Sequence, residues 1–365
     1  MMKKLGKLFK SYTFNIILVV SVTVLVMWLV LKDNAADIFG MLQRANYWYV
    51  LLILLMMLLT RVLLGWTLMT EVHLSDPRYN LTQGTINAFI ASFFNGITPS
   101  STGGQFAQMY AFRKQGVPVS RSVGVLWMDF IIYQTTMVIS VLILILLRFS
   151  VFYVRYSQFF IIVLFGFLVN AAVIAGLWAM VRFPSFYTWL TTTGMNIGYK
   201  IHIVKDKEKT AANIKRQLSE FQKEVEILRH HKQMILKIAA ADLLRLLLYY
   251  AVPYYCARAL HVDIDISMFI DVLALSSFVS MVNAFIPLPG ASGGTEASFI
   301  LMFSTIFGKI NASSIMILWR VITYYLMLLA GGIVFIYSRT QRDVPCLEES
   351  QANESSIAED EEKTI

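Results

Sequence analysis

Three arginines lie deep within long apolar stretches of the chain, at Arg61, Arg245 and Arg320. An arginine at the centre of a bilayer costs between about 2.5 and more than 10 kcal/mol, so it normally faces a partner or a water-filled cavity. That partner is either the phosphate of an anionic lipid or a carboxylate of the protein. The carboxylates in neighbouring apolar stretches, which would act as charge partners or couple proton movement, are Asp129, Asp242 and Glu296. The first alternative makes the arginines a headgroup site, and the second makes them structural.

Two short segments rich in glycine and proline interrupt apolar runs. They read Asn95-Gly-Ile-Thr-Pro-Ser-Ser-Thr-Gly-Gly-Gln105 and Asn283-Ala-Phe-Ile-Pro-Leu-Pro-Gly-Ala-Ser-Gly-Gly-Thr-Glu296. Proline lacks a backbone donor, and glycine permits conformations that other residues resist. In hydrocarbon, such a break survives only where protein buries it or where it lines a polar cavity. Paired breaks in two halves of a membrane protein indicate a transporter's binding site.

Each break contains a double glycine at which a second helical arm is expected to begin. Free N–H groups and the positive end of the helix dipole would suit a phosphate or carboxylate there. The residues expected to bind a headgroup at these tips, besides the three arginines, are Ser100, Ser101, Thr102, Gly103, Gly104, Gln105, Ser292, Gly293, Gly294, Thr295 and Glu296. The alternative is that the breaks only allow helices to pack closely. Glu296 either titrates and couples proton movement to transport or pairs with an arginine, and pairing is favoured.

An enzymatic interpretation of the second break is disfavoured. Gly290-Ala-Ser292-Gly-Gly294 fits G-x-S-x-G, but a nucleophile elbow needs a strand before the serine and a histidine after it. The flank here is an apolar helix, and the last histidine, His261, precedes Ser292. The histidines show no metal-binding spacing. We therefore expect no catalytic residue, no metal and no cofactor.

Composition places the chain in a membrane. Of its 365 residues, 57% are hydrophobic and 15% are charged, against about 45–50% and about 25% in soluble domains. The net charge of +8 is concentrated in a few segments, which favours an anionic membrane face over nucleic acid as a partner. We expect an all-α polytopic protein, a helical bundle whose two halves each contain a broken or re-entrant segment.

Six apolar runs are long enough to span a bilayer at roughly 20 residues each. They are Phe14–Leu31, Trp48–Met69, Val119–Leu147, Phe159–Val181, Met234–Ala259 and Ala312–Tyr337, with broken segments at about Leu81–Phe112 and Ser267–Phe307. Each broken segment is either a re-entrant hairpin or a full crossing. Hairpins place the basic connection at 182–233 and both termini in the cytoplasm, as the positive-inside rule favours. The expected organisation is a membrane domain at 1–342, in the cell membrane, and an acidic disordered tail at 343–365.

The two halves, about 48–147 and 234–337, align as an inverted repeat. Pro99, Gly103 and Gly104 match residues of the same type 190 positions later, and Arg61 matches Arg245. Under the hairpin topology, the two arginine-bearing helices cross the membrane in opposite directions. Inverted repeats of this kind are typical of alternating-access transporters.

The two break motifs resemble the paired motifs of the lysylphosphatidylglycerol synthase transmembrane region, also called the flippase-like domain, which includes the membrane part of the multiple peptide resistance factor. The resemblance covers about residues 10–340. It implies a protein that moves an aminoacylated phosphatidylglycerol, another anionic phospholipid or an isoprenoid-phosphate-linked lipid between leaflets. The resemblance implies that the lipid is handled by Thr98–Gln105, Gly290–Glu296 and the membrane arginines. The full-length synthase also carries a soluble domain that transfers the amino acid, for which the tail of about twenty residues leaves no room.

Two alternatives to a translocase follow. The chain is the membrane component of a phosphatidylglycerol lysyltransferase system, or it is a scaffold for envelope-lipid enzymes. The expected partners are membrane lipids with anionic headgroups and, under these alternatives, a separate aminoacyl- or glycosyltransferase, with no nucleic acid. The sequence predicts no oligomeric state.

Overall fold

A computed structural model describes residues 35–74, 76–98, 102–148, 231–283 and 288–341, together with 167–172, 174–176 and the single positions 179, 286 and 344. Four predicted segments lie wholly or mostly outside the described residues. They are the first helix at 14–31, most of the helix at 159–181, the basic connection as far as residue 230 and the acidic tail beyond 344. Ser100 and Ser101 of the first break also lie outside them.

The described residues form helices and no β-strand, which confirms the all-α prediction. In chain order the elements are α3 (Ala35–Gln43), α4 (Tyr47–Val72), α5 (Leu81–Ile97), α6 (Gly103–Lys114), α7 (Val119–Leu147), α12 (Lys232–Ala259), η1 (Ile266–Met268), α13 (Phe269–Asn283), α14 (Gly294–Phe307), α15 (Lys309–Arg320), the π-helical η2 (Val321–Leu326) and α16 (Met327–Thr340). The bounds of α7 coincide with its predicted apolar run. The bounds of α4 and α12 each differ from their own predicted runs by at most three residues.

Four helices in the described part of the chain are long and apolar enough to cross a membrane. They are Tyr47–Val72, Arg121–Leu147, Ile266–Asn283 and Lys309–Thr340. Two results differ from the predicted spans. The stretch Ile266–Asn283, expected to be one arm of a broken segment, is long enough to span by itself. Helix α12 has 28 residues but is not in this group, because Lys237, Asp242 and Arg245 interrupt its apolar surface.

Both predicted interruptions are present. Helix α5 ends at Ile97 and α6 begins at Gly103, while α13 ends at Asn283 and α14 begins at Gly294. The two arms of each interruption pack against each other. The re-entrant course of these arms through a membrane stays a prediction.

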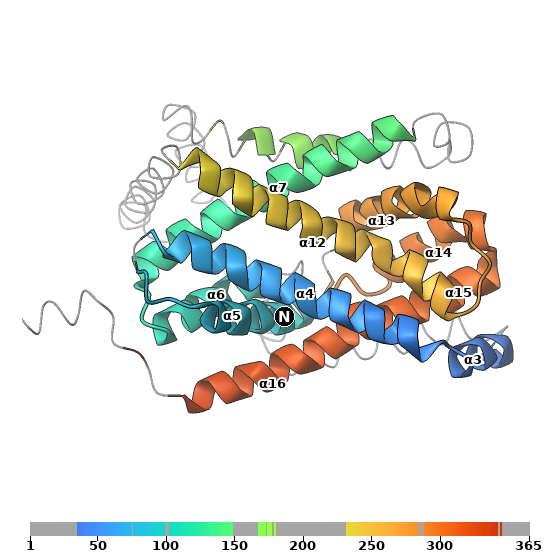
Figure 1. Ribbon diagram of the computed structural model, residues 1–365, viewed down its shortest axis with the longest axis horizontal. Coiled ribbons are helices and arrows are strands. Elements are labelled where there is room, and N and C mark those ends of the chain that lie inside the picture. The colour runs from blue at the N-terminus through green and yellow to red at the C-terminus, as the bar shows by residue number, and fades with distance from the viewer. Residues whose placement is uncertain are drawn as a thin grey trace, which may run out of the picture.

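The helices that carry Arg61 and Arg245 lie at the centre of the bundle. Helices α4 and α12 pack along each other in antiparallel directions, and the N–H of Asn46 at the start of α4 donates to the carbonyl of Ala259 at the end of α12 at 2.7 Å. Figure 1 shows this pair between α7 on one side and α16 on the other. Both arginines lie near the middle of their helices, which have 26 and 28 residues.

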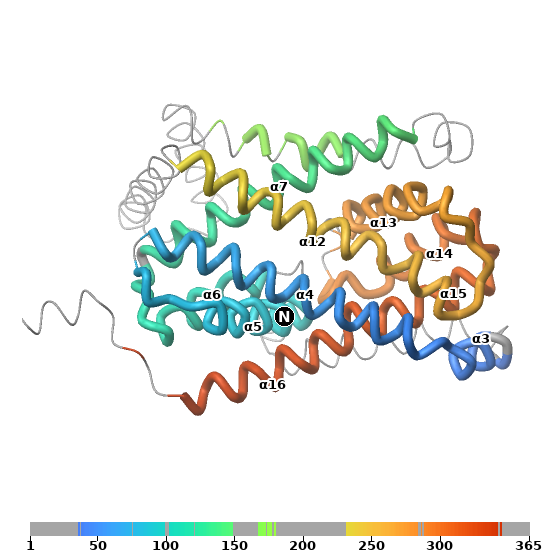
Figure 2. Tube along the Cα trace, in the orientation of Figure 1, coloured from blue at the N-terminus to red at the C-terminus, as the bar shows by residue number. Residues whose placement is uncertain are grey.

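The contacts between helices keep the same pattern when the two halves are exchanged. In the first half α4 contacts α5 and α7, α5 contacts α6, and α6 contacts α7; in the second half α12 contacts α13 and α15, α13 contacts α14, and α14 contacts α15. The contacts between halves also pair, since α7 lies on α12 and α13 while η2 lies on α4 and α16 lies on α5. Figure 2 shows α5 and α6 toward one end of the central pair and α13, α14 and α15 toward the other. A duplicated chain would have this pattern, and the inverted repeat itself stays a prediction.

Candidate functional site

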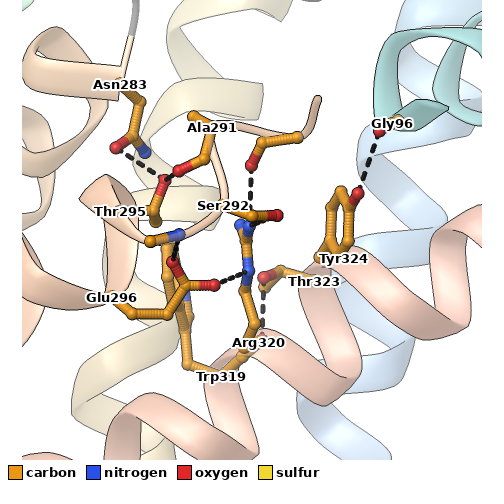
Figure 3. A network of polar contacts seen from close by, with 12 residues as sticks. Gly96, Asn283, Ala291, Ser292, Thr295, Glu296, Trp319, Arg320, Thr323 and Tyr324 are labelled. Carbon is orange, nitrogen blue, oxygen red and sulfur yellow. Dashed lines mark hydrogen bonds and ion pairs between the residues drawn. The ribbon is translucent and has the colours of Figure 1, made fainter. Parts of the chain in front are cut away.

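The second break is held by a buried ion pair between α14 and α15. The Nε of Arg320 lies 2.8 Å from Oε1 of Glu296, and both side chains are less than a tenth exposed. The other carboxylate oxygen, Oε2, accepts the N–H of Gly293 at 2.6 Å. Because Glu296 is the third residue of α14, it also satisfies a donor that the start of a helix leaves unpaired. Figure 3 shows one carboxylate holding both the arginine and the turn before α14.

The turn between the two arms depends on glycine. Gly290 and Gly293 have φ values of 58° and 88°, and Ala291 between them also has a positive φ of 50°. The Nη2 of Arg320 donates to the carbonyl of Gly290 at 2.6 Å and to the hydroxyl of Ser292 at 3.4 Å. The guanidinium therefore binds the turn from inside the bundle, with a carboxylate as its ion-pair partner and a carbonyl and a hydroxyl as its hydrogen-bond acceptors.

Tyr324 joins the second break to the first. Its hydroxyl donates to the carbonyl of Gly96 at the end of α5 at 2.9 Å, and the guanidinium carbon of Arg320 lies 4.1 Å from the centre of its ring. A Cβ added at Gly290 would lie 2.2 Å from the same hydroxyl. Tyr324 stands in the π-helical η2, and a short π segment inside an α-helix is frequent at functional sites. One side chain thus contacts both interruptions (Figure 3).

The first break is held by neutral side chains of its own first arm. The N–H of Gly103 donates to Oγ1 of Thr98 at 2.9 Å, and the N–H of Gly104 donates to Oδ1 of Asn95 at 3.0 Å. Sequence analysis expected free donors at both tips. In the structure, Gly103, Gly104 and Gly293 use theirs within the protein, as buried donors generally must.

The two central arginines have different partners. The Nη2 of Arg245 lies 3.2 Å from Oδ1 of Asp242, one turn earlier on α12, and its guanidinium carbon lies 4.7 Å from the ring centre of Tyr133 on α7. The hydrogen bonds of Arg61 go to hydroxyls, with Nη1 on Ser92 at 2.7 Å and Nε on Thr60 at 3.3 Å. Among the described residues, Arg61 therefore has no carboxylate at ion-pair distance.

Electrostatic proximity connects these groups into one cluster. Arg61 and Arg245 lie close enough to repel each other, and Asp129 lies close enough to attract Arg245. Tyr249 of α12 interacts with both Arg61 and Arg320 and packs its ring 6.2 Å from that of Trp319. The central cluster comprises Arg61, Asp129, Tyr133, Asp242, Arg245 and Tyr249.

The predicted site residues thus fall into two groups. Ser292, Gly293, Thr295 and Glu296 gather around Arg320, with the hydroxyl of Thr295 donating to Oδ1 of Asn283 at 2.8 Å. Arg61, Arg245, Asp129 and Asp242 gather between α4, α7 and α12. Thr102 and Gln105 are exposed at the start of α6.

The sequence does not single out several residues that connect these groups. They are Asn95, Tyr133, Tyr249, Asn283 and Tyr324. Asn95 and Thr98 stand within the first motif, where their oxygen atoms could have been matched to the glycine donors. Tyr324 follows Arg320 by one helical turn, a spacing that places both side chains on one face.

The arrangement suits recognition of an anion. In the described part of the chain, no group of three or more His, Cys, Asp or Glu residues could hold a metal ion. Arginine binds phosphate with a planar fork of donors, and its charge is permanent. Of the three arginines, Arg61 is the one without a carboxylate at ion-pair distance among the described residues.

A comparison with family models matches residues 16–331 to the lysylphosphatidylglycerol synthase TM region. Searches of curated proteins and of solved structures found no match. The matched residues include both broken segments and all three membrane arginines. The chain therefore belongs to the family of lysylphosphatidylglycerol synthase transmembrane regions.

Proposed function

We propose that this protein moves the headgroup of an anionic lipid between the leaflets of a membrane, and that Arg61 and Arg245 bind that headgroup. The observation that carries the proposal is the pair of mid-helix guanidinium groups on the antiparallel helices α4 and α12. They lie close enough to repel each other, and among the described residues Arg61 has hydroxyl partners and no carboxylate at ion-pair distance. A guanidinium without an ionic partner is costly in a medium of low dielectric constant, and a phosphate bound beside Arg61 would supply that partner.

The central position of the pair supports transport over static lipid binding. A headgroup at the middle of two long helices is remote from both faces of the bilayer, as a translocation intermediate must be. The helices of the two halves make equivalent contacts, which supports the same proposal. Alternating access needs two related arrangements around one site. Acyl tails would remain in lipid while the headgroup passes the arginines.

The proposal is tested by measuring which lipids remain bound to the purified protein. Native mass spectrometry of protein extracted gently from its membrane should detect a retained anionic lipid. Arg61→Ala should reduce retention roughly tenfold to hundredfold, since a hydrogen bond to a charged group contributes about 1.5–3 kcal/mol. The matched control is Arg78→Ala, which removes an exposed arginine paired with Asp76 in the turn between α4 and α5. A bulk-like lipid profile that neither variant changes would contradict the proposal.

The family description favours one second candidate. The chain would be the membrane component of a lysylphosphatidylglycerol synthase system, receiving lipid from an aminoacyltransferase on another chain. Formation of aminoacyl lipid when such a transferase and charged tRNA are added, and its absence without this protein, would favour that candidate. Transport of unmodified phosphatidylglycerol by the protein alone would favour the translocase.

A further inference from the structure

The two carboxylates of the central cluster face one guanidinium. Asp129 on α7 and Asp242 on α12 both interact with Arg245, and they lie close enough to repel each other. Thr67 of α4 donates its hydroxyl to Oδ1 of Asp129 at 3.3 Å. The side chain of Asp242 is fully buried, with Oδ1 in the ion pair, and Oδ2 has no hydrogen-bond donor among the described residues. A buried carboxylate oxygen without a donor is a place where a proton would be stabilising.

The charges of the cluster without lipid balance when both carboxylates are ionised. Arg61 and Arg245 contribute two positive charges, and Asp129 and Asp242 contribute two negative charges. Among the described residues, Tyr133 of α7 also faces the carboxylates, and Tyr249 of α12 faces Tyr133 and Arg61; tyrosines are neutral near pH 7. Arg320 of α15 lies near Tyr249 and is itself balanced by Glu296.

An anionic headgroup would disturb this balance. If a phosphate with one negative charge binds at Arg61, the cluster has a net negative charge in a region of low dielectric constant. Protonation of one carboxylate restores neutrality. It also leaves Arg245 with one ionised partner in place of two.

We propose that the Asp129–Asp242 pair takes up one proton when an anionic headgroup binds, so that the protein moves the lipid anion and the proton together. The proton comes from water on the side from which the headgroup enters and forms an O–H bond on one carboxylate oxygen. When the headgroup leaves, that bond breaks and the proton returns to water on the opposite side. No other bond changes. The inference rests on the proposed function and gives it a coupling ion.

The sequence names Asp129, Asp242 and Glu296 as charge partners or proton-coupling groups, and titration of Glu296 is one of its alternatives. In the structure, both oxygens of Glu296 are occupied, one by Arg320 and the other by the N–H of Gly293. Its protonation would break a complete network. Asp242 has a free oxygen and a second carboxylate beside it, which makes the central pair the better proton site.

The test is the pH dependence of lipid affinity. The purified protein in non-ionic detergent is titrated with phosphatidylglycerol, whose phosphodiester stays ionised across this range, so any pH dependence belongs to the protein. Uptake of one proton on binding makes Kd rise about tenfold for each pH unit, with tighter binding at lower pH. We expect this slope at pH values at which both carboxylates are ionised in the protein without lipid. In the same pH range, one of them is protonated in the complex with lipid.

Two variants assign the slope to the pair. Asp242→Asn mimics the protonated carboxylate, and Asp129→Asn does the same while keeping the ion pair of Asp242 with Arg245. Each should bind phosphatidylglycerol with a Kd that no longer depends on pH and that matches the tight binding of the wild type at low pH. The control is Asp271→Asn, which removes a carboxylate paired with Arg148 at 3.0 Å outside the cluster and should keep the wild-type slope.

The outcomes separate the two proposals. The proton inference is overturned if the Kd for phosphatidylglycerol does not depend on pH, or if its pH dependence persists in both Asn variants. Neither result contradicts the proposed lipid translocation. No binding at any pH contradicts both. If a variant fails to fold, infrared difference spectra of the wild type with and without lipid decide the question. A protonated carboxyl band that appears with lipid supports the inference, and its absence overturns it.

Discussion

The two interruptions of the bundle are stabilised by different chemistry. The first, between α5 and α6, is closed by neutral groups of its own first arm, with Thr98 and Asn95 accepting from the double glycine. The second, between α13 and α14, is closed by Glu296 and fixed to the next helix by Arg320. At an offset of 190 residues Phe106 takes the position of Glu296, and its side chain is exposed. We expect the second interruption, which is fixed by a buried ion pair, to be more rigid than the first.

Tyr324 adds to this difference. It belongs to the second half, yet its hydroxyl bonds to the carbonyl of Gly96 at the end of α5. Among the described residues, Lys114 at the end of α6 also donates to the carbonyls of Ser338 and Arg339 in the second half. The bond of Tyr324 to Gly96 is neutral and lies at the interruption itself. A movement of the first half would break that bond, while the Glu296–Arg320 pair would stay intact.

The largest expected effect is that of Glu296→Ala. It would leave Arg320 buried without its carboxylate and remove the acceptor of the Gly293 N–H. Removing one partner of a buried ion pair costs about 3–5 kcal/mol in free energy of unfolding. Denaturant unfolding in detergent measures the loss. The control, Asp76→Ala, removes the carboxylate of the exposed ion pair with Arg78 and should cost far less. Equal costs for the two variants would refute the idea of a rigid second interruption.

A smaller effect is expected for Gly290→Ala. The residue has a φ of 58°, and an added Cβ would lie 2.2 Å from the hydroxyl of Tyr324. Backbone strain and overpacking together should cost about 2–4 kcal/mol. Gly40→Ala is the control, because a Cβ there meets nothing within 4 Å. If Gly290→Ala unfolds at the wild-type denaturant midpoint, the turn does not depend on this glycine.

The corresponding substitution in the first interruption should cost less than Glu296→Ala. Asn95→Ala leaves the N–H of Gly104 without its acceptor, at about 1–2 kcal/mol, as for the loss of a helix N-cap. Hydrogen exchange at the start of α6, followed by mass spectrometry, should accelerate locally while exchange in α14 stays unchanged. Faster exchange in both arms would mean that the two interruptions are one cooperative unit.

The smallest expected effect is that of Tyr324→Phe. It removes one hydrogen bond, to Gly96, at about 0.5–1.5 kcal/mol, and keeps the ring against Arg320. The exchange at the end of α5 should accelerate more than the exchange at Gly290 and Ser292. The opposite order would show that Tyr324 supports the second interruption more than the first.

Much of this architecture follows from residue type and spacing. The helix bounds of α4, α7 and α12 are visible as apolar runs, the breaks as glycine and proline, and the buried charges as arginines far from helix ends. The pairing of Glu296 with Arg320 was one of two alternatives, because charge alone does not reveal which helices touch.

The sequence does not indicate which groups satisfy the broken backbone. Asn95 and Thr98 reach the double glycine only because α5 and α6 pack against each other, and Tyr324 reaches Gly96 only because η2 and α16 lie against the first half. The contact of Arg61 with Ser92 also depends on tertiary packing, because it forms only where α4 and α5 meet. The pair of Asp242 with Arg245 is local, since the two residues are one turn apart on α12.

The central claim is that Arg61 and Arg245 bind a lipid headgroup during its passage. It is tested most directly by reconstituting the protein in vesicles and following the transfer of labelled phosphatidylglycerol between leaflets. Arg61→Ala should slow transfer roughly tenfold to hundredfold, Arg61→Lys should fall between that variant and the wild type, and Arg78→Ala should transfer at the wild-type rate. Transfer by Arg61→Ala at the wild-type rate would contradict the account.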